Sequence, residues 1–188
     1  MRRLRPVRLV LAAVALALTC MAYLSMLQAT GNRHQVVAGV LYRSAQPDAA
    51  MLRQAAGQGV RSVLNLRGTS PGSDWYQAEI AAARDLGLVH RDFAMSASRA
   101  LGSDDIAALI ALMRDMPKPL LVHCKSGADR TGLAAALYVI ALAGGSEWQA
   151  ELQLSPLYGH IGVPYLSAAW PMDESWELAE AGLGLTDS

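Results

Sequence analysis

The sequence predicts an α/β domain, in which helices flank a small and mostly parallel β-sheet, preceded by one N-terminal transmembrane helix. Three observations lead to this prediction. Residues 9–27 hold no charged side chain, the chain after residue 35 alternates between strand-like and helix-like segments, and its most apolar strand is followed by an apolar helix. A length of 188 residues suits one domain with a short appendage.

The composition excludes several classes of protein. The 16 basic and 16 acidic side chains cancel to a formal charge of zero, whereas sequence-independent nucleic-acid binding needs a surplus of lysine and arginine. The two cysteines, Cys20 and Cys124, are too few for a disulfide framework or a cysteine-rich zinc site. A mean hydropathy of +0.22 excludes a disordered chain and suggests that some apolar surface faces lipid.

The membrane helix is predicted from an uncharged run that follows a cluster of arginines. As a helix that rises ~1.5 Å per residue, residues 9–27 approach the ~30 Å thickness of the hydrocarbon core. The preceding segment contains no acid and four arginines: Arg2, Arg3, Arg5 and Arg8. By the positive-inside rule, this segment stays in the cytoplasm and the rest of the chain crosses the membrane.

We therefore expect a single-pass protein of the bacterial inner membrane, with its folded domain outside the cytoplasm. Its expected parts are a basic segment over 1–8, an anchor over 9–27, a linker over 28–35 and the domain over 36–188. A cleaved signal peptide is the alternative, but signal peptides have apolar cores of about 7 to 15 residues and small residues at the cleavage site. The best candidate site, Leu27-Gln28-Ala29, has leucine where a small residue is needed.

Four segments of the domain are predicted as strands, because they are short, rich in β-branched and apolar residues, and bounded by turn residues. They cover residues 35–43, 60–66, 88–93 and 120–122. The first contains Gly39, which indicates a short hairpin or a bent strand. The last reads Leu-Leu-Val, and such a wholly apolar run is typical of a buried parallel strand.

The segments between and after these strands are predicted as helices from their caps and apolar spacing. They run from Pro47 to Gly57, from Asp74 to about Gly87, from Ser103 to Pro117, from Leu133 to Ala143, from Ser146 to Leu154 and from Ser167 to Ala181. Asp74 and Gln77 have the spacing of a capping box. In the third helix, apolar side chains recur at i, i+3, i+4 and i+7, so one stripe faces a core.

The segment between the last predicted strand and the helix at 133–143 is the most informative one. It reads His123-Cys124-Lys125-Ser126-Gly127-Ala128-Asp129-Arg130-Thr131-Gly132. A loop between a strand and a helix N-terminus can turn successive backbone N–H groups inward, so that they bind a phosphate with the helix dipole behind it. The expected amide donors are Lys125, Ser126, Gly127 and Ala128, and Gly127 permits the backbone angles that such a loop needs.

Two side chains of this loop predict covalent chemistry. Arg130 carries a planar guanidinium that can hold two phosphate oxygens. The loop amides favour negative charge on the sulfur of Cys124, which makes it a nucleophile at neutral pH. Attack on a phosphate monoester would give a phosphocysteine, which water hydrolyses in a second step. The alternative, a buried structural Cys124 beside a surface Arg130, leaves their spacing unexplained.

These residues resemble the signature HCxxGxxR[ST] of the cysteine-dependent protein tyrosine and dual-specificity phosphatases, matched at His123, Cys124, Gly127, Arg130 and Thr131. The segments YRSAQP at 42–47 and NLR at 65–67 also resemble the entry motifs of the compact bacterial branch of that superfamily. The resemblance covers roughly residues 35–145. It implies the phosphatase α/β fold, a phosphate-monoester substrate, and neither a metal nor a cofactor.

The resemblance also implies a role for each matched residue. Cys124 corresponds to the nucleophile and Arg130 to the phosphate clamp. His123 corresponds to the residue that orients the loop and tunes the cysteine, and Thr131 to the hydroxyl that eases departure of the thiolate.

The proton donor for the leaving alcohol has several candidates. The family takes an aspartate from a loop ahead of the cysteine, but residues 95–102 contain no acid. We prefer Asp129, because it adjoins Arg130 as in the myotubularin branch, and a nearby phosphate favours its protonated form. A structural Asp129 that turns away to pair with Arg43 or Arg67 is the competing interpretation.

Asp92 is the second candidate for this proton donor. Because it lies in a predicted strand, it could equally be a residue that flanks the sheet and has no part in catalysis. Asp104 and Asp105 follow, and both also suit the capping and the dipole of the helix that they begin. Arg43, Arg67 and Arg99 are interpreted as loop braces or surface residues rather than phosphate ligands.

The sequence thus predicts a membrane-anchored phosphatase that acts on phosphotyrosine, with dual specificity as an extension. The expected partners are a phosphorylated protein and the membrane. A phosphoinositide or other phospholipid is the alternative substrate, because Lys125 and a bilayer anchor suit it as well. A phosphate-binding module without turnover and a rhodanese-like sulfur transferase are the further alternatives.

Overall fold

The computed structural model describes residues 4–185, in which five strands form one sheet of order β1-β2-β5-β3-β4. The strands are β1 (His34–Val37), β2 (Leu41–Ser44), β3 (Ser62–Asn65), β4 (Val89–Asp92) and β5 (Leu120–His123). β1 and β2 form an antiparallel hairpin, and the other neighbours are parallel. The predicted α/β fold with a mostly parallel sheet is confirmed, and so is the hairpin around Gly39.

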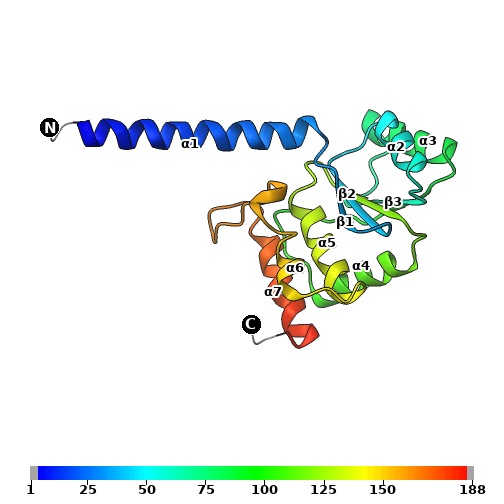
Figure 1. Cartoon of the computed structure of the whole chain (residues 1–188). Helices are drawn as coiled ribbons and strands as arrows, with labels where there is room; N and C mark the ends of the chain where they lie inside the picture. The colour runs from blue at the N-terminus through cyan, green and yellow to red at the C-terminus, as the bar shows by residue number, and fades with distance from the viewer. Residues whose placement is uncertain (1–3, 186–188) are drawn as a thin grey trace.

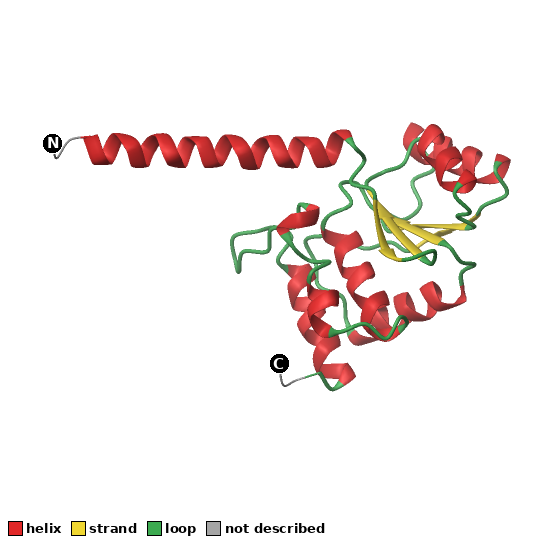
Figure 2. Ribbon diagram, in the orientation of Figure 1, coloured by secondary structure: helices red, strands yellow, loops and turns green. Residues whose placement is uncertain are grey.

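Helices cover both faces of this sheet, as Figure 2 shows. The described residues form the helices α2 (Ala49–Gly57), α3 (Asp74–Asp85), α4 (Ser103–Asp115), α5 (Asp129–Ala141), α6 (Glu147–Glu151) and α7 (Pro171–Leu183), with a 3₁₀ turn η1 (Pro156–Tyr158). A further helix, α1 (Leu4–Ala29), precedes the sheet in the chain. α2 and α3 pack on one face, and α4 and α5 pack on the other, with α6 and α7 beyond α5 (Figure 1).

The central strand β5 shows why the sheet is buried on both faces. Leu120 and Val122 contribute to the core beneath α4 and α5, whereas Leu121 contributes to the smaller core beneath α2 and α3. Successive side chains of a strand point to opposite faces of the sheet, and both faces are apolar here. In α5 all nine residues from Thr131 to Val139 are buried, which explains why its sequence is apolar on every side.

The register brings the carboxyl ends of the four parallel-running strands into one row. Ser44 and Asn65 both pair with His123, and Asp92 pairs with Asn65. The loop after β5 therefore leaves the middle of the sheet at its carboxyl edge, where ligand sites of open α/β sheets form.

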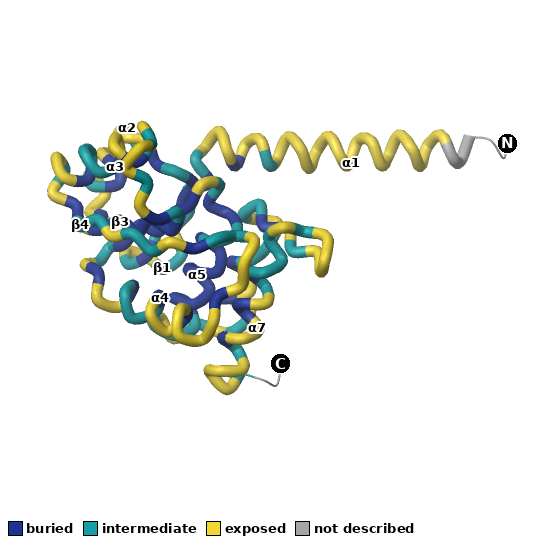
Figure 3. Tube along the Cα trace, turned by 180° about the vertical axis from the view of Figure 1, so that it is seen from behind, coloured by how far each residue is buried: buried dark blue, intermediate teal, exposed yellow. Residues whose placement is uncertain are grey.

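α1 projects from the domain and is exposed along most of its length (Figure 3). Its stretch Val7–Ala29, of 23 residues, is long and apolar enough to cross a membrane, and the predicted anchor over 9–27 lies within it. Length and composition of this kind are shared by membrane spans and signal sequences. The predicted linker over 28–35 contains the last turn of α1, a turn of the chain and the start of β1.

Several helix ends differ from the expected ones. The capping box predicted for Asp74 and Gln77 is wrong, because Ser73 is the N-cap of α3 and Gln77 donates instead to the Pro71 carbonyl. A capping box does form at α6, between Ser146 and Gln149. α6 ends at Glu151 rather than at Leu154, and α7 begins at Pro171 rather than at Ser167. α5 begins at residue 129 rather than 133, since its first turn is polar and belongs to the site described next.

Candidate active site

The loop of residues 124–128 joins β5 to α5, and its shape depends on Gly127. This glycine has a φ of +72°, in the left-handed region that favours glycine. A Cβ atom at this position would lie 2.5 Å from the Ala45 nitrogen and 2.6 Å from the Ser44 carbonyl carbon. The loop therefore packs against the end of β2, and no other residue fits at position 127.

The carbonyl groups of this loop are all held on its outer side. The Cys124 carbonyl lies 3.4 Å from His123 Nδ1, and each of the next four accepts a hydrogen bond from another part of the chain. The backbone amide of Gln46 donates to the Lys125 carbonyl, and the side chains of Asn32 and Gln28 donate to the Ser126 carbonyl. The guanidinium of Arg43 donates to the carbonyls of Gly127 and Ala128, and the Ala128 carbonyl also accepts from the Gly132 amide.

The outward carbonyls leave the amide groups of the loop for a ligand. Within residues 4–185, the N–H groups of Lys125, Ser126 and Gly127 donate to no other part of the chain. Successive free amides in front of a helix N-terminus form an anion-binding nest. A phosphate group therefore fits the concave side of this loop.

Arg130 lies in the first turn of α5 and is fixed by the loops after two other strands. Its Nη1 donates to the Met95 carbonyl at 3.2 Å and to the Leu66 carbonyl at 3.5 Å. Its Nε is buried and has no hydrogen-bond partner among the described residues. A half-buried guanidinium with a free donor is suited to bind an anion.

Arg43 holds carbonyl groups of this loop, which agrees with its interpretation as a loop brace. Its side chain is fully buried, and its guanidinium donates to Gln153 and to the carbonyls of Gly127 and Ala128. Its guanidinium carbon also lies 4.0 Å from the centroid of the Tyr158 ring. Burial lowers the pKa of Arg43 from 12.5 to about 10, so the side chain stays charged at neutral pH.

Arg67 faces the site from the loop after β3. Its guanidinium carbon lies 3.4 Å above the ring of Trp75, and its Nη1 donates to Gln46 Oε1 at 2.7 Å. Burial and the positive charge of Arg130 lower the pKa of Arg67.

A buried carboxylate, Glu79, supports His123 and was not predicted from the sequence. Oε1 of Glu79 lies 2.9 Å from His123 Nε2 and 2.7 Å from His90 Nε2, and its Oε2 accepts from Gln46. Burial alone would raise the pKa of Glu79, but hydrogen bonds from His123 and His90 outweigh it and lower the pKa from 4.5 to about 2. The sequence held one signal that Glu79 is buried. It lies three residues after Tyr76, and both belong to the stripe of α3 that faces the core.

We expect this carboxylate to make the domain acid-sensitive. Because the folded pKa of Glu79 lies below 4.5, its contribution to stability is present above pH 4.5 and is lost as the pH falls toward 2. The contribution should be on the order of 3 kcal/mol, since one pKa unit corresponds to about 1.4 kcal/mol. Urea unfolding across this pH range measures it, and Glu79→Gln should lose stability at neutral pH and flatten the acid slope. An unchanged slope in that variant would contradict this account.

Asp129 does not pair with Arg43 or Arg67, and its partner is His160. Oδ1 of Asp129 lies 2.8 Å from His160 Nδ1, and Oδ2 of Asp173 lies 3.0 Å from His160 Nε2. Burial disfavours the charged imidazole, but the hydrogen bonds and charges of the two carboxylates outweigh it and raise the pKa of His160. His160 thus fixes Asp129 at the edge of the loop, with a quarter of the Asp129 side chain exposed.

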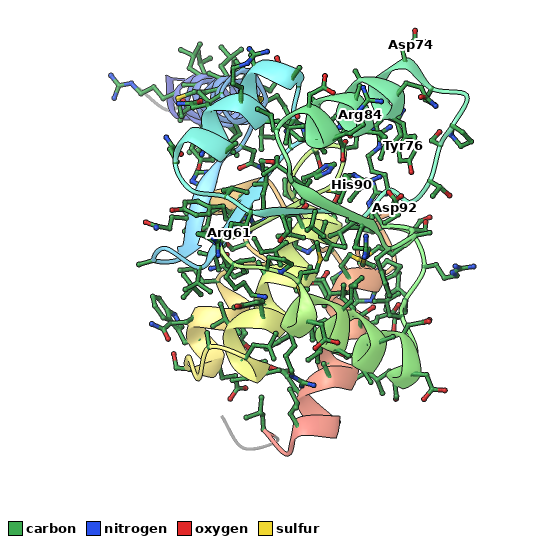
Figure 4. The ribbon with its side chains drawn as sticks, turned by 90° about the vertical axis from the view of Figure 1, so that its right-hand side faces the viewer. Arg61, Asp74, Tyr76, Arg84, His90 and Asp92 are labelled. Atoms are coloured by element: carbon green, nitrogen blue, oxygen red, sulfur yellow. The ribbon has the colours of Figure 1, made fainter. Side chains whose placement is uncertain are left out.

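The other acidic candidates lie in different environments. Both oxygens of Asp92 accept hydrogen bonds, from Asn65 Nδ2 at 2.7 Å and from Tyr76 Oη at 2.6 Å. Figure 4 shows Tyr76 and Asp92 close together, between α3 and β4. The hydrogen bond to Asp92 raises the pKa of Tyr76 to about 12. Asp104 and Asp105 are exposed in the first turn of α4, where they suit the helix dipole.

Comparisons with known proteins agree with this geometry. Residues 24–148 match the model of a family described as the tyrosine phosphatase family. Among solved structures, TpbA of P. aeruginosa has a TM-score of 0.57 at 20% identity, with 80% of this chain and 92% of that chain covered. A Cys-to-Ser variant of TpbA in complex with pTyr has a TM-score of 0.56 at 20% identity, with coverages of 80% and 91%.

The Siw14 catalytic core is a further similar structure, with a TM-score of 0.56 at 18% identity over 82% of this chain and 94% of that chain. At these identities the likeness shows the fold. A comparison with curated proteins gave no match.

Proposed function

Because this chain belongs to the tyrosine phosphatase family and is a phosphatase, we propose that it hydrolyses phosphate monoesters with Cys124 as the nucleophile. The observation that carries the proposal is the loop of residues 124–128, whose carbonyls are held outward so that its free amides face a ligand. Cys124 begins this loop and Arg130 follows it. We propose Lys125, Ser126 and Gly127 as the amide donors to the phosphate, with Ala128 as the fourth donor, whose amide lies 3.4 Å from Ser126 Oγ and exchanges that partner for the phosphate.

The reaction proceeds in two displacements. The Cys124 thiolate attacks phosphorus, the bond from phosphorus to the leaving oxygen breaks, and Asp129 gives its proton to that oxygen. Water then attacks the phosphocysteine, Asp129 takes a proton from this water, and the bond between sulfur and phosphorus breaks to return the thiolate. Arg130 and the loop amides stabilise the charge on the equatorial oxygens in both steps.

Acid quenching of the enzyme during turnover of ³²P-labelled substrate tests this mechanism. We expect label on the peptide that contains Cys124, and steady-state hydrolysis of p-nitrophenyl phosphate that is unaffected by EDTA. Activity that EDTA abolishes, or label on another residue, would contradict the cysteine mechanism. Absence of turnover in the wild-type protein would favour the binding module.

We propose Asp129 as the proton donor, supported by its place beside Arg130 and by the partial exposure of its side chain at the edge of the loop. Asp129→Asn should lower kcat/KM by about 10²- to 10⁴-fold for a substrate with a poor leaving group, such as an alkyl phosphate. For p-nitrophenyl phosphate the effect should be small, because its leaving group needs little protonation. Rates with both substrates measure the difference.

Asp105→Asn is the matched control for this comparison, because Asp105 is exposed and lies outside the loop. It should leave both rates unchanged. A loss in Asp129→Asn that is equal for the two substrates, or a leaving-group dependence in Asp92→Asn, would show that another residue donates the proton.

Phosphotyrosine in proteins is the proposed substrate, with phosphoserine and phosphothreonine as the extension. The family and the buried Nε of Arg130, which is free among the described residues, support an aryl phosphate as the substrate. A phospholipid phosphate is the second candidate, because the end of α1 contacts the catalytic loop through Gln28 and Ser126. Rates on phosphopeptides and on phosphoinositide vesicles distinguish the two.

We also propose that α1 anchors the protein in the bacterial inner membrane, with the phosphatase domain of residues 36–188 outside the cytoplasm. The apolar stretch Val7–Ala29 and the arginines before it support this orientation. Extraction with alkaline carbonate should leave the protein in the membrane fraction, and protease added to spheroplasts should digest the domain. Intact, carbonate-soluble protein would contradict the anchor.

A further inference from the structure

We propose that residues 156–166, here called the apolar loop, insert into the lipid bilayer beside α1 and dock the domain on the membrane. This inference rests on the membrane anchoring proposed above. The proposed partner is the hydrocarbon and interfacial region of the lipid leaflet on the domain side of the membrane.

The composition of the apolar loop is unusual for a segment in water. From Leu152 to Met172 the sequence contains no Asp, Glu, Lys or Arg. The loop exposes large apolar side chains next to one another: Leu157 (52% exposed), Ile161 (50%), Val163 (40%), Tyr165 (96%) and Leu166 (86%). An exposed apolar patch of this kind marks an interaction site.

The apolar loop lies directly against α1. Tyr23 Oη of α1 donates to the Leu157 carbonyl at 2.6 Å. A narrow groove between the two segments is lined by Thr19, Cys20, Tyr23 and Leu24 of α1 and by Pro156 and Ile161 of the loop. Figure 1 and Figure 3 both show the loop projecting from the domain on the side to which α1 extends.

The length of α1 places this contact within the membrane. The 23 residues of Val7–Ala29 rise by about 35 Å, and the hydrocarbon core is ~30 Å thick, so nearly the whole stretch is needed to span it. Thr19 lies about 15 Å along the helix from Ala29. A segment that contacts α1 between Thr19 and Leu24 is therefore at the depth of lipid when α1 spans the bilayer.

Part of the backbone of the apolar loop is bonded within the chain. The amides of Leu166 and Ser167 donate to the Val163 carbonyl, and Ser167 Oγ donates to the Ile161 carbonyl. The amides at 161–163 and 165 donate to no other described residue, so they need water or lipid headgroups, and the insertion that we propose reaches the interfacial region of the leaflet. His160 is buried, and both of its ring nitrogens are bonded to carboxylates of the domain. The tip therefore presents apolar side chains and the amphipathic ring of Tyr165, which is typical of a membrane interface.

The charged helix α7 limits the orientation of the domain. Asp173 and Glu174 lie in its first turn, and Figure 1 shows the apolar loop between α1 and α7. Transmembrane helices tilt by about 20° on average. A tilt of α1 toward the loop inserts the loop and keeps α7 in water.

Depth-dependent quenching of an environment-sensitive fluorophore tests the insertion. The full chain with Cys124→Ser, Cys20→Ser and Leu166→Cys is labelled with a nitrobenzoxadiazole group and reconstituted in vesicles of phosphatidylcholine and phosphatidylglycerol. Because Leu166 is exposed, the substitution should not disturb the fold. A second protein keeps Cys20, which is exposed on α1, as the reference for the bilayer. A third carries Arg84→Cys on α3 as the reference for water.

We expect the label at position 166 to shift its emission to the blue and to be quenched by phosphatidylcholine that carries a doxyl group near its headgroup, whereas a doxyl group deep in the acyl chain quenches the label at Cys20 most strongly. The label at position 84 should show neither effect. Quenching at Cys20 without quenching at 166 would overturn the insertion of the loop and leave the anchor standing. Absence of quenching at both positions would overturn the loop and the anchor together.

Discussion

The Cys124→Ser variant is expected to lose phosphatase activity by a factor of about 10⁴ or more. The hydroxyl of serine ionises far less readily than a thiol, so the loop amides can no longer stabilise a nucleophilic anion at this position. The loop geometry should persist, since Ser and Cys differ by one atom and the Gly127 turn does not depend on the sulfur. Steady-state hydrolysis of p-nitrophenyl phosphate measures the loss.

Cys20→Ser is the matched control for this variant, because Cys20 is exposed on α1 and far from the loop along the chain. It should retain wild-type activity. Binding of a phosphopeptide to Cys124→Ser provides a second measurement, which should stay close to that of the wild type because the amides and Arg130 remain. A Cys124→Ser protein that turns over substrate at the wild-type rate would remove Cys124 from the mechanism.

Arg43→Met should lower the free energy of unfolding by about 3–5 kcal/mol and reduce activity as well. Hydrogen bonds to a charged group are worth about 1.5–3 kcal/mol each, and a buried acceptor that loses its donor adds a desolvation cost. Arg43 donates four such bonds, two to Gln153 and one each to the carbonyls of Gly127 and Ala128. Methionine retains much of the apolar volume of the stem, so the change isolates the loss of the guanidinium.

Arg53→Met provides the control, because Arg53 is exposed on α2. Its effect on stability should stay within about 0.5 kcal/mol. Thermal and urea unfolding of both variants measure the contrast. Equal stabilities of the two variants would show that Arg43 does not support the loop.

The sequence predicted the sheet well because its strands carry strong local signals. Leu120-Leu121-Val122 is apolar on both faces and has become the central strand β5. The starts of α3 and α4 were predicted at Asp74 and Ser103, where the structure has them, but the start of α5 was missed because its first turn is polar. The apolar pattern of α5 starts at Leu133, but its helix starts at Asp129, where tertiary contacts with His160 hold the first turn.

The centre of the site could be predicted because it is contiguous in sequence, from Cys124 to Arg130. Its supports could not, because they come from distant elements that only the fold brings together. Glu79 and His160 lie 44 and 31 residues from the loop residues that they contact. No residue near His160 in the sequence is the partner of its side chain, and only the fold brings it to Asp129.

Asn32 gives the catalytic loop a support from a residue that follows the helix α1 in the chain. Its buried side chain stands beyond the end of α1 and donates to the carbonyls of Ser126 and Tyr158. Gln28, the other donor to the Ser126 carbonyl, belongs to α1. A protease that cut the chain after Ala29 would therefore remove one donor and leave the other in place. The helix and this support of the loop are therefore separate parts of the chain, because the asparagine that holds the loop follows the helix in sequence.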